Sequence, residues 1–269
     1  MAAPQPAAGL TALVTGASSG IGTEFAQQLA AKGWHVTLVA RRREKLESIA
    51  KGIVSGGGQA DVVACDLADD DSRAALLEEL ASGSRQVAVL VNNAGSSTTG
   101  PIWSADVSAE LGMVRADVEA VVHLCAALIP PMVERGSGVV LNVASTAAFQ
   151  PIPGQAGYAA AKAFVLSYSQ ALHAELAGKG VSVTALCPGP VETGFADAAG
   201  FDPAVARKAM PDVMWESAAD VATAAIDGAF AGKRVVIPGW ANAAGAVAAQ
   251  HLPRRLLLAM LRRQHPAMK

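Results

Sequence analysis

Short apolar runs alternate with longer amphipathic runs along most of this chain. The apolar runs are rich in β-branched residues, and several are apolar almost throughout, which is typical of strands covered on both faces of a parallel sheet. They lie at 11–16, 34–41, 60–67, 87–95, 138–145, 181–189 and 234–239. Apolar residues recur at helical spacing in the segments between them, at 21–32, 43–54, 70–81, 107–135, 156–177 and 217–231. The pattern therefore predicts an α/β fold built from repeated strand–helix units.

The predicted architecture is a Rossmann-like, doubly wound, seven-stranded parallel sheet with helices on both faces. Neither an internal repeat nor a linker divides the sequence, so we expect a single domain. Sheets of this kind bind their ligands beyond the carboxyl ends of the strands. The candidate functional residues are therefore expected at strand ends.

Composition narrows the classes of function. The chain has 269 residues, of which 52% are hydrophobic, and its formal charge of −2 gives no basis for general nucleic-acid binding. Cys65, Cys125 and Cys187 stand singly in apolar runs, which argues against a disulfide framework or a metal site and fits a reducing compartment. The N-terminus MAAPQPAAGL lacks the pattern of a signal peptide, and no run of about 18 apolar residues occurs. We expect a cytoplasmic protein.

The first strand ends in the glycine-rich turn TGASSGIG, residues 15–22, and leads directly into a helix. Glycines in such a turn let backbone N–H groups approach a pyrophosphate, which then sits at the positive end of the helix. Many strand–helix turns contain glycine only for a positive φ, but this position after the first strand favours a dinucleotide site. The candidate binding residues of this turn are Gly16, Ser18, Ser19, Gly20, Ile21 and Gly22.

Three arginines, residues 41–43, follow the second strand, where an NAD site would carry an acid for the ribose hydroxyls. Cations at a helix start are unfavourable unless an anion joins them. The 2′-phosphate of NADP(H) would supply that anion, with Arg41 and Arg42 as its nearest contacts. The alternative is a solvated basic helix start that Glu44 and Glu47 partly neutralise. The sequence favours NADP(H).

Polar residues also end the third and fourth strands. Asp66 can accept from the adenine amino group, or it can cap the helix that begins near Asp69. The NNAG stretch offers side-chain amides that can bridge strand ends, followed by two small residues that allow close approach to a cofactor. The candidate cofactor residues at these two strand ends are Asp66, Leu67, Asn93, Ala94 and Gly95.

Tyr158 and Lys162 stand four residues apart in the helical stretch YAAAK, so they share one helix face. An aromatic ring packed over a snorkelling lysine would also fit this spacing. A nearby ammonium, however, stabilises phenolate and lowers the pKa of tyrosine. Tyr158 could then act as a general acid or base, an effect of about 10²–10⁴-fold in rate. Ser145, at a strand end, can donate to a substrate oxygen.

Taken in order, TGASSGIG, NNAG, Ser145 and YAAAK resemble the short-chain dehydrogenase/reductase family, and the resemblance spans about residues 9–239. It implies an NADP(H)-dependent oxidoreductase that interconverts a carbonyl and an alcohol. Tyr158 would be the general acid/base, and Lys162 would hold the nicotinamide ribose. The segment PGPVET resembles the one that closes over the nicotinamide. The contacts implied there are Pro188, Gly189, Val191 and Thr193.

One catalytic position departs from the family pattern. The family usually has an asparagine in the long helix after NNAG, where it supports a water chain from the lysine, and here Asp117 takes that place. A carboxylate accepts a hydrogen bond from water but does not donate one unless protonated. The implied catalytic set is Ser145, Tyr158, Lys162 and Asp117. The alternative function is a catalytically weak NADP(H)-binding sensor or scaffold.

Bulky apolar residues gather where the family's substrate loop falls, at about 190–216. They are compatible with a hydrophobic or lipid-like carbonyl or alcohol substrate, or with simple packing of a short helix. These residues are Phe195, Phe201, Met210, Met214 and Trp215, and Phe149, Pro151 and Ile152 are expected to line the same cleft.

Composition changes after Gly239, where leucines alternate with Arg254, Arg255, Arg262 and Arg263. A short basic amphipathic helix there can touch an anionic membrane weakly, or pack on the domain or across a subunit boundary. We therefore expect an extension at 1–8, a catalytic domain at 9–240 and a basic tail at 241–269. The resemblance also implies a homodimer or homotetramer formed through the helices at 107–135 and 156–177.

Overall fold

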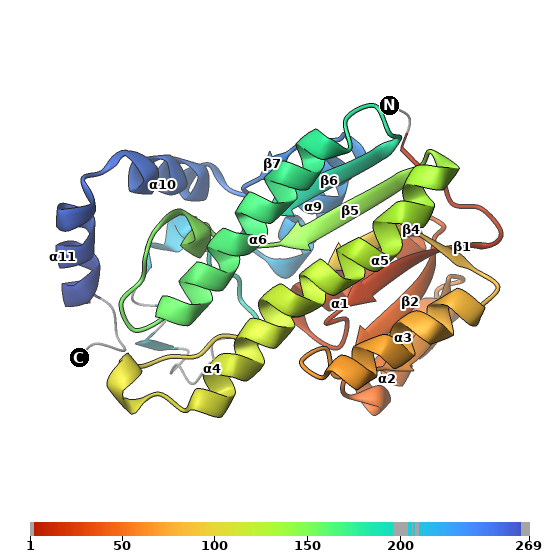
Figure 1. Cartoon of the computed structure of the whole chain (residues 1–269), viewed down its shortest axis with the longest axis horizontal. Helices are drawn as coiled ribbons and strands as arrows, with labels where there is room; N and C mark the ends of the chain where they lie inside the picture. The colour runs from red at the N-terminus through yellow and green to blue at the C-terminus, as the bar shows by residue number, and fades with distance from the viewer. Residues whose placement is uncertain (1–2, 196–203, 206, 208–209, 265–269) are drawn as a thin grey trace.

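The protein is built around one parallel sheet of seven strands (Figure 1). The computed structural model describes residues 3–195, 204, 205, 207 and 210–264. The strand order is β3-β2-β1-β4-β5-β6-β7, and every neighbouring pair is parallel. The strands are β1 (Leu10–Thr15), β2 (His35–Ala40), β3 (Gln59–Ala64), β4 (Gln86–Asn92), β5 (Gly138–Val143), β6 (Val181–Leu186) and β7 (Val235–Val236). The predicted fold class is confirmed.

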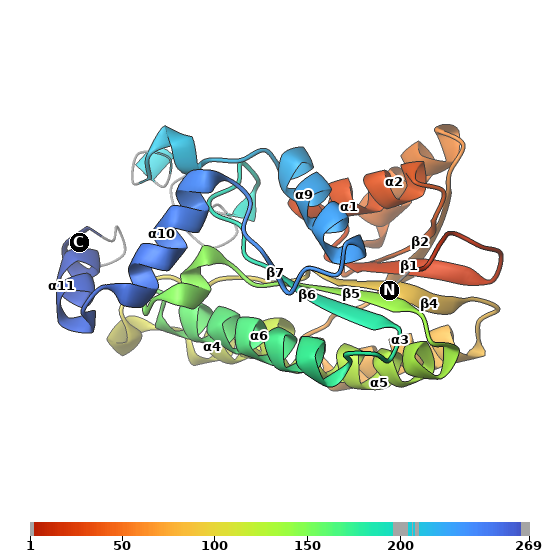
Figure 2. The ribbon, with the colours of Figure 1, turned by 90° about the horizontal axis from the view of Figure 1, so that it is seen from above.

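Helices cover both faces of the sheet, as Figure 2 shows. One face carries α1 (Gly20–Ala31), α2 (Arg43–Ser55) and α9 (Ala218–Phe230), and the other carries α3 (Asp70–Ser82), α5 (Ala120–Arg135) and α6 (Ala156–Glu175). Each face has its own hydrophobic core, so side chains from both sides of a strand are removed from water. This explains why the strand sequences are apolar almost throughout.

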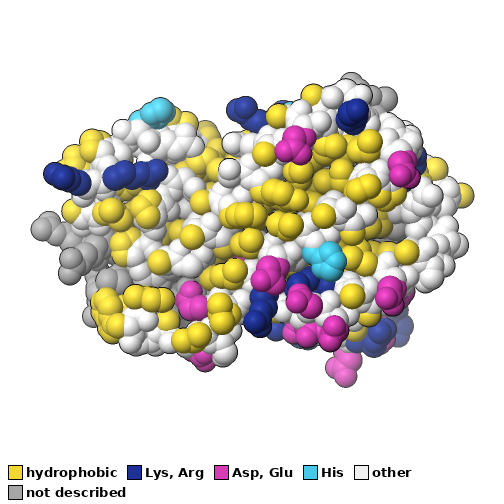
Figure 3. Space-filling model, viewed as in Figure 1, with side chains coloured by type: hydrophobic (Ala, Val, Ile, Leu, Met, Phe, Trp, Pro, Cys, Tyr) yellow, Lys and Arg dark blue, Asp and Glu magenta, His cyan; other side chains and the backbone are white. Residues whose placement is uncertain are grey.

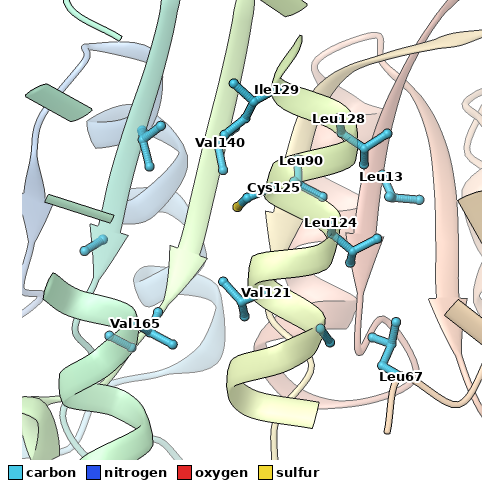
Figure 4. Packing of buried hydrophobic residues seen from close by; sticks show 14 of the residues in the cluster. Leu13, Leu67, Leu90, Val121, Leu124, Cys125, Leu128, Ile129, Val140 and Val165 are labelled. Atoms are coloured by element: carbon cyan, nitrogen blue, oxygen red, sulfur yellow. The ribbon is translucent and has the colours of Figure 1, made fainter. Parts of the chain in front are cut away.

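The core beneath α5 illustrates how the sequence pattern becomes packing. Val121, Leu124 and Leu128 point from one side of this helix toward the strands, where they meet residues such as Leu90 and Val140 (Figure 4). The three cysteines are buried free thiols, as predicted. Removing water from these side chains contributes about 25 cal/mol for each Å² of apolar surface.

The predicted helix 107–135 is continuous but not uniform. It consists of α4 (Val107–Val114), a π-helical turn (Arg115–Glu119) and α5. By length and composition alone, this segment could cross a membrane. Its α5 part nevertheless buries Leu124, Leu128 and Met132 in the core of the sheet, which accounts for its apolar character.

The C-terminal segment forms two helices rather than the single one predicted. They are α10 (Trp240–His251) and α11 (Arg254–Gln264). Pro253 lies between them, and its ring has no N–H to continue the helical hydrogen bonds. Ala246 and Ala249 of α10 are buried in the core, whereas α11 lies at the edge of the molecule, at the end toward which β5 points (Figures 1 and 2).

Candidate active site

The ends of β1 and β4 are tied together by hydrogen bonds. Thr15 Oγ1 accepts from the backbone N–H groups of Asn93 (2.9 Å) and Ala94 (3.0 Å). Asn93 Nδ2 donates in return to the Thr15 carbonyl, also at 2.9 Å. The side-chain amide therefore bridges strand ends, and it fixes the NNAG stretch beside the glycine turn.

The glycine turn has no room for side chains at its centre. A Cβ on Gly22 would lie 2.2 Å from the Gly16 carbonyl oxygen. Gly16 and Gly20 have φ values of +65° and +56°, a region that favours glycine. A Cβ on Gly20 would lie 3.0 Å from Thr193 Cγ2, so the segment 188–193 rests against this turn.

The start of α1 is suited to an anion. Ser19 occupies the N-cap position without making a side-chain cap, and the first turn contains no acidic residue. The first N–H groups of the helix and its positive end are therefore left for another partner. A pyrophosphate fits these groups and the tight glycine turn below them.

The arginines after β2 lie at the surface beside the glycine turn. Arg42 Nη2 donates to Ser18 Oγ at 3.1 Å, and both Arg41 and Arg42 are exposed. No ion pair joins them to Glu44 or Glu47 in the part of the chain that the structure describes. Partial neutralisation by these acids is therefore not seen, but both arginines are solvated, so the solvated helix start and the 2′-phosphate contact both stay predictions.

The loop after β3 separates the two roles considered for Asp66. Asp69 caps α3 by accepting from the Ser72 N–H at 2.8 Å. The Asp66 carboxylate instead accepts from the Ala68 N–H at 3.0 Å, within its own loop. Asp66 is therefore not the cap of α3, and its contact with the adenine stays a prediction. Leu67 is buried beside it.

Tyr158 and Lys162 lie on the same face of α6, as their spacing predicts. Lys162 Nζ is 5.7 Å from the centre of the Tyr158 ring. The lysine is buried, and its Nζ donates to the Val143 carbonyl at the end of β5 (3.2 Å). Ser145 lies just beyond that strand, accepts from the Ala147 N–H at 3.1 Å and shares a hydrogen bond with Tyr158. The Tyr158 phenol, the Lys162 ammonium and the Ser145 hydroxyl therefore lie close to one another.

Asp117, which takes the place of the family's usual asparagine, contacts the lysine directly. Its Oδ2 lies 2.8 Å from Lys162 Nζ, and its side chain is completely buried. Oδ1 accepts from the Ser96 N–H at 2.8 Å. A Cβ on Gly95 would come within 3.2 Å of both carboxylate oxygens and of the ammonium, so a larger residue there would press on this ion pair. Asp117 lies in the π-helical turn Arg115–Glu119, which no sequence motif predicted.

The charges around Tyr158 act in opposite directions on its pKa. Burial raises the pKa of Tyr158, Lys162 and the hydrogen bond with Ser145 lower it, and Asp117 raises it; the net shift is upward. The lowering that we predicted from Lys162 is present but is outweighed by burial. For Lys162, burial lowers the pKa, but Asp117 and Tyr158 raise it more strongly. At neutral pH Tyr158 is therefore a protonated phenol beside the Lys162 ammonium.

The segment 188–193 is fixed between the reaction centre and the substrate loop. The Pro188 carbonyl accepts from the Thr146 N–H at 2.9 Å, one residue after Ser145. The Pro190 carbonyl accepts from the Glu216 N–H at 3.1 Å, and Val191 pairs with Glu216 in a short parallel bridge. The sequence motif did not reveal a further contact from α10, where the buried Asn242 packs against this segment.

Only part of the predicted apolar lining surrounds Tyr158. The Phe195 ring lies 5.8 Å from the Tyr158 ring, and Phe195 remains 39% exposed. Phe149, predicted to line the cleft, is instead buried in the core, because the short helix Thr146–Phe149 turns its ring inward. Trp215 is partly buried beneath the Arg207 guanidinium. Phe201 lies outside the described residues.

Comparison with known proteins identifies relatives of the chain. The sequence model described as short chain dehydrogenase matches residues 10–203. A sulfoacetaldehyde reductase of Chromohalobacter salexigens is 38% identical over 184 residues, which are 68% of this chain and 72% of that protein. A very-long-chain 3-oxoacyl-CoA reductase of Anas platyrhynchos is 36% identical over 199 residues, 71% of this chain and 63% of that protein.

The chain spans less than two thirds of the length of some relatives. A short chain dehydrogenase of Pseudocercospora fijiensis is 36% identical over 187 residues, 69% of this chain and 60% of that protein. A short-chain dehydrogenase from Sphingobium yanoikuyae in complex with NADPH superposes with a TM-score of 0.79 at 30% identity, over 94% of this chain and 93% of that one. A short chain dehydrogenase/reductase from Burkholderia phymatum in complex with NAD gives 0.78 at 26% identity, over 89% and 92%. With its parallel sheet and its glycine turn, this chain belongs to the short-chain dehydrogenase family.

Proposed function

We propose that this protein is an NADP(H)-dependent oxidoreductase that interconverts an apolar ketone or aldehyde and the corresponding alcohol. The observation that carries the proposal is the meeting of Tyr158, Lys162 and Ser145 beside the segment 188–193. A protein that only sensed NADP(H) would need the glycine turn and the arginines, but not a proton donor held this way.

Each group has a distinct task in this proposal. The nicotinamide supplies the hydride when bound. Tyr158, protonated at neutral pH because its pKa is raised, donates a proton to the carbonyl oxygen during reduction and takes one back during oxidation. Ser145 donates a hydrogen bond to the same oxygen. Lys162 favours phenolate once the proton has left, and Asp117 keeps the lysine charged and in place.

The proposed cofactor contacts extend across the strand ends. The pyrophosphate is placed on the start of α1, the 2′-phosphate near Arg41 and Arg42, and the adenine near Asp66 and Leu67. The absence of an acid after β2 supports NADP(H) in this chain. The Sphingobium relative binds NADPH, but the Burkholderia relative binds NAD, so the choice rests on the arginines of this chain.

An apolar substrate is supported by Phe195, whose ring lies 5.8 Å from the Tyr158 ring. The relatives do not decide the question. One is named for sulfoacetaldehyde, a small charged compound, and another for very-long-chain 3-oxoacyl-CoA. An exposed aromatic ring next to the proton donor would favour an apolar group beside the carbonyl.

The test is NADPH oxidation with a panel of ketones and aldehydes that runs from short polar compounds to long-chain and aromatic ones. We expect turnover to favour apolar members, and Tyr158→Phe to lower it by about 10²–10⁴-fold while NADPH binding, followed by fluorescence, is retained. Tight NADPH binding with no turnover on any member, in parent and variant alike, would support the sensor instead.

We further propose that the protein is a homo-oligomer. By resemblance to its family, α4, α5 and α6 form the subunit contact. Val107 and Leu111 of α4 are 71% and 50% exposed, and Phe164 of α6 is 42% exposed and stacks on Tyr168. Leu111→Asp should lower the sedimentation coefficient to that of a smaller species. Val54→Asp, at a 56% exposed position on α2, is the matched control and should leave it unchanged.

The basic tail is proposed to make a weak contact with an anionic membrane, while residues 9–240 form the catalytic domain. Residues 240–269 contain five Lys and Arg and no Asp or Glu, so residues 1–239 carry a net charge of −7. On α11, Leu256 and Met260 are 65% and 44% exposed, and basic side chains lie at this end of the molecule (Figure 3). The protein should pellet with vesicles that contain phosphatidylglycerol but not with pure phosphatidylcholine, and Leu256→Asp should weaken that binding.

A further inference from the structure

Asn242 is a fully buried polar side chain in α10, the first helix of the C-terminal segment. Its Nδ2 donates two hydrogen bonds to carbonyl groups from separate parts of the chain. One is the carbonyl of Met214 at the exit of the substrate loop (3.0 Å), and the other is that of Pro238 just before α10 (3.1 Å). A buried amide that joins two distant backbone segments fixes their relative position.

The same side chain packs against the segment expected to close over the nicotinamide. A Cβ on Gly189 would lie 2.2 Å from Asn242 Oδ1, so the Gly189 backbone rests directly on the carboxamide. Among the described residues, Asn242 Oδ1 is buried and has no hydrogen-bond partner. A buried acceptor without a partner is costly and is usually explained by its surroundings. Here it faces the backbone of the proposed cofactor segment.

Further contacts join the exit of the substrate loop, the segment 188–193 and the start of α10. Glu216 holds the Pro190 carbonyl through its backbone N–H. A Cβ on Gly239, which has a φ of +75°, would meet the Glu216 carboxylate oxygen. The substrate-loop exit, the segment 188–193 and the start of α10 are therefore in mutual contact, and the Pro188 carbonyl connects them to the turn that follows Ser145.

We propose that Asn242 is a positioning residue for the oxidoreductase reaction. Through Gly189 it sets the position of the nicotinamide-binding backbone, and through Met214 it holds the exit of the substrate loop. The C-terminal helix α10 is then part of the active site rather than an appendage. This inference rests on the proposed function, because it assigns the segment 188–193 to the nicotinamide.

The experiment compares Asn242→Ala with Ala249→Gly. Ala249 is buried on the same helix and its methyl side chain can make no hydrogen bond, so its replacement by glycine weakens α10 and keeps the Asn242 hydrogen bonds to Met214 and Pro238. We expect Asn242→Ala to raise the Kd for NADPH by about 5- to 30-fold. The rise in Tm at saturating NADPH should shrink in this variant, because ligand stabilisation follows the ratio of ligand concentration to Kd.

Ala249→Gly should lower the Tm of the free protein while keeping the parent's Kd and its NADPH-induced rise in Tm. If Asn242→Ala lowers the Tm but leaves the Kd within twofold of the parent value, Asn242 is only structural and the proposal fails. Should that variant not fold, Asn242→Ser, which keeps one hydroxyl donor, serves for the same comparison.

The two proposals fail in different ways. A parent protein that binds NADPH in an Asn242-dependent manner, yet reduces no carbonyl in the panel, would overturn the oxidoreductase but not the positioning role of Asn242. A parent that binds neither NADPH nor NADH would overturn both.

Discussion

The two ends of the proposed cofactor cleft use charge in opposite ways. At the reaction centre, Asp117 and Lys162 are buried, 2.8 Å apart and held by further hydrogen bonds. At the other end, Arg41 and Arg42 are exposed, and Arg42 donates a hydrogen bond to the Ser18 hydroxyl. A desolvated charge must be paired to remain charged, whereas a solvated one stays charged on its own. The buried end therefore has one fixed geometry, and the exposed end keeps freedom to meet a ligand.

The two ends are therefore expected to serve different purposes: the buried end the proton transfer, and the exposed end the choice between NADP(H) and NAD(H). In the proposed reaction, Tyr158 must be held within hydrogen-bond reach of the substrate oxygen, and the buried pair fixes Lys162 beside it. Recognition of a 2′-phosphate needs positive charge and hydrogen-bond donors, which exposed arginine side chains can supply. Substitutions at the two ends should accordingly change different measurements, and the largest effect should come from the buried end.

Asp117→Leu should destabilise the protein most strongly. It leaves Lys162 buried without its anion, and breaking a buried ion pair from one side costs about 3–5 kcal/mol. Urea unfolding of parent and variant measures the loss. Arg42→Ala is the control at the exposed end and should change the free energy of unfolding by less than about 0.5 kcal/mol. If both variants lost the same free energy of unfolding, the buried and exposed ends would not differ in their contribution to stability.

Arg42→Ala should instead change cofactor preference. Losing a charged donor to the 2′-phosphate should raise the Kd for NADPH by about 10- to 100-fold and leave the Kd for NADH unchanged. Titration with both nucleotides checks this, with Arg43→Ala as the neighbouring control. Since the site is exposed, the parent's preference for NADPH should also decline as salt increases. A preference that persists in Arg42→Ala would show that the arginine is not the selecting group.

Phe195→Ala tests the apolar contact at the buried end. Aromatic pairs contribute about 0.5–1.5 kcal/mol, so we expect the KM for an apolar aromatic ketone to rise by about two- to tenfold. The KM for a small polar aldehyde should hardly change. Val213→Ala, at a position 51% exposed in the same loop region, provides the comparison. A uniform rise for all substrates would indicate a distorted loop rather than a lost contact.

Asp117→Asn should produce the smallest effect, a displacement of a pH profile. Asp117 raises the pKa of Tyr158 and also that of Lys162, so a neutral amide should let both fall. Alcohol oxidation needs the phenolate, and its rate rises as Tyr158 loses its proton. The rising limb of the rate–pH curve should therefore move to lower pH. A limb that moves to higher pH would mean that the carboxylate does not act on the phenol as described.

The strands were the most predictable elements because both of their faces are buried. Their apolar runs located all seven, although the last shrank from 234–239 to two residues. Spacing likewise brought Tyr158 and Lys162 onto one helix face. The glycine turn, NNAG and Ser145 meet because the carboxyl ends of neighbouring parallel strands lie at one edge of the sheet.

What could not be predicted depends on tertiary contacts. The direct ion pair of Asp117 requires a π-helical turn, and the hydrogen-bond register of a helix leaves no mark in the sequence when packing decides it. Asn242 stands in an alanine-rich helix, and its partners are backbone carbonyls that carry no residue signature. The net rise in the pKa of Tyr158 depends on burial, which spacing alone does not report.

The π-helical turn also sets how the two halves of the long helix are rotated. Such a turn holds one residue more than an α-helical turn, and each residue turns the chain by about 100°. Deleting one residue between 115 and 119 would convert this wide turn into an ordinary α-helical turn, and the backbone that places Asp117 beside Lys162 would change. The position of the buried carboxylate therefore depends on the width of this single turn as well as on the identity of residue 117.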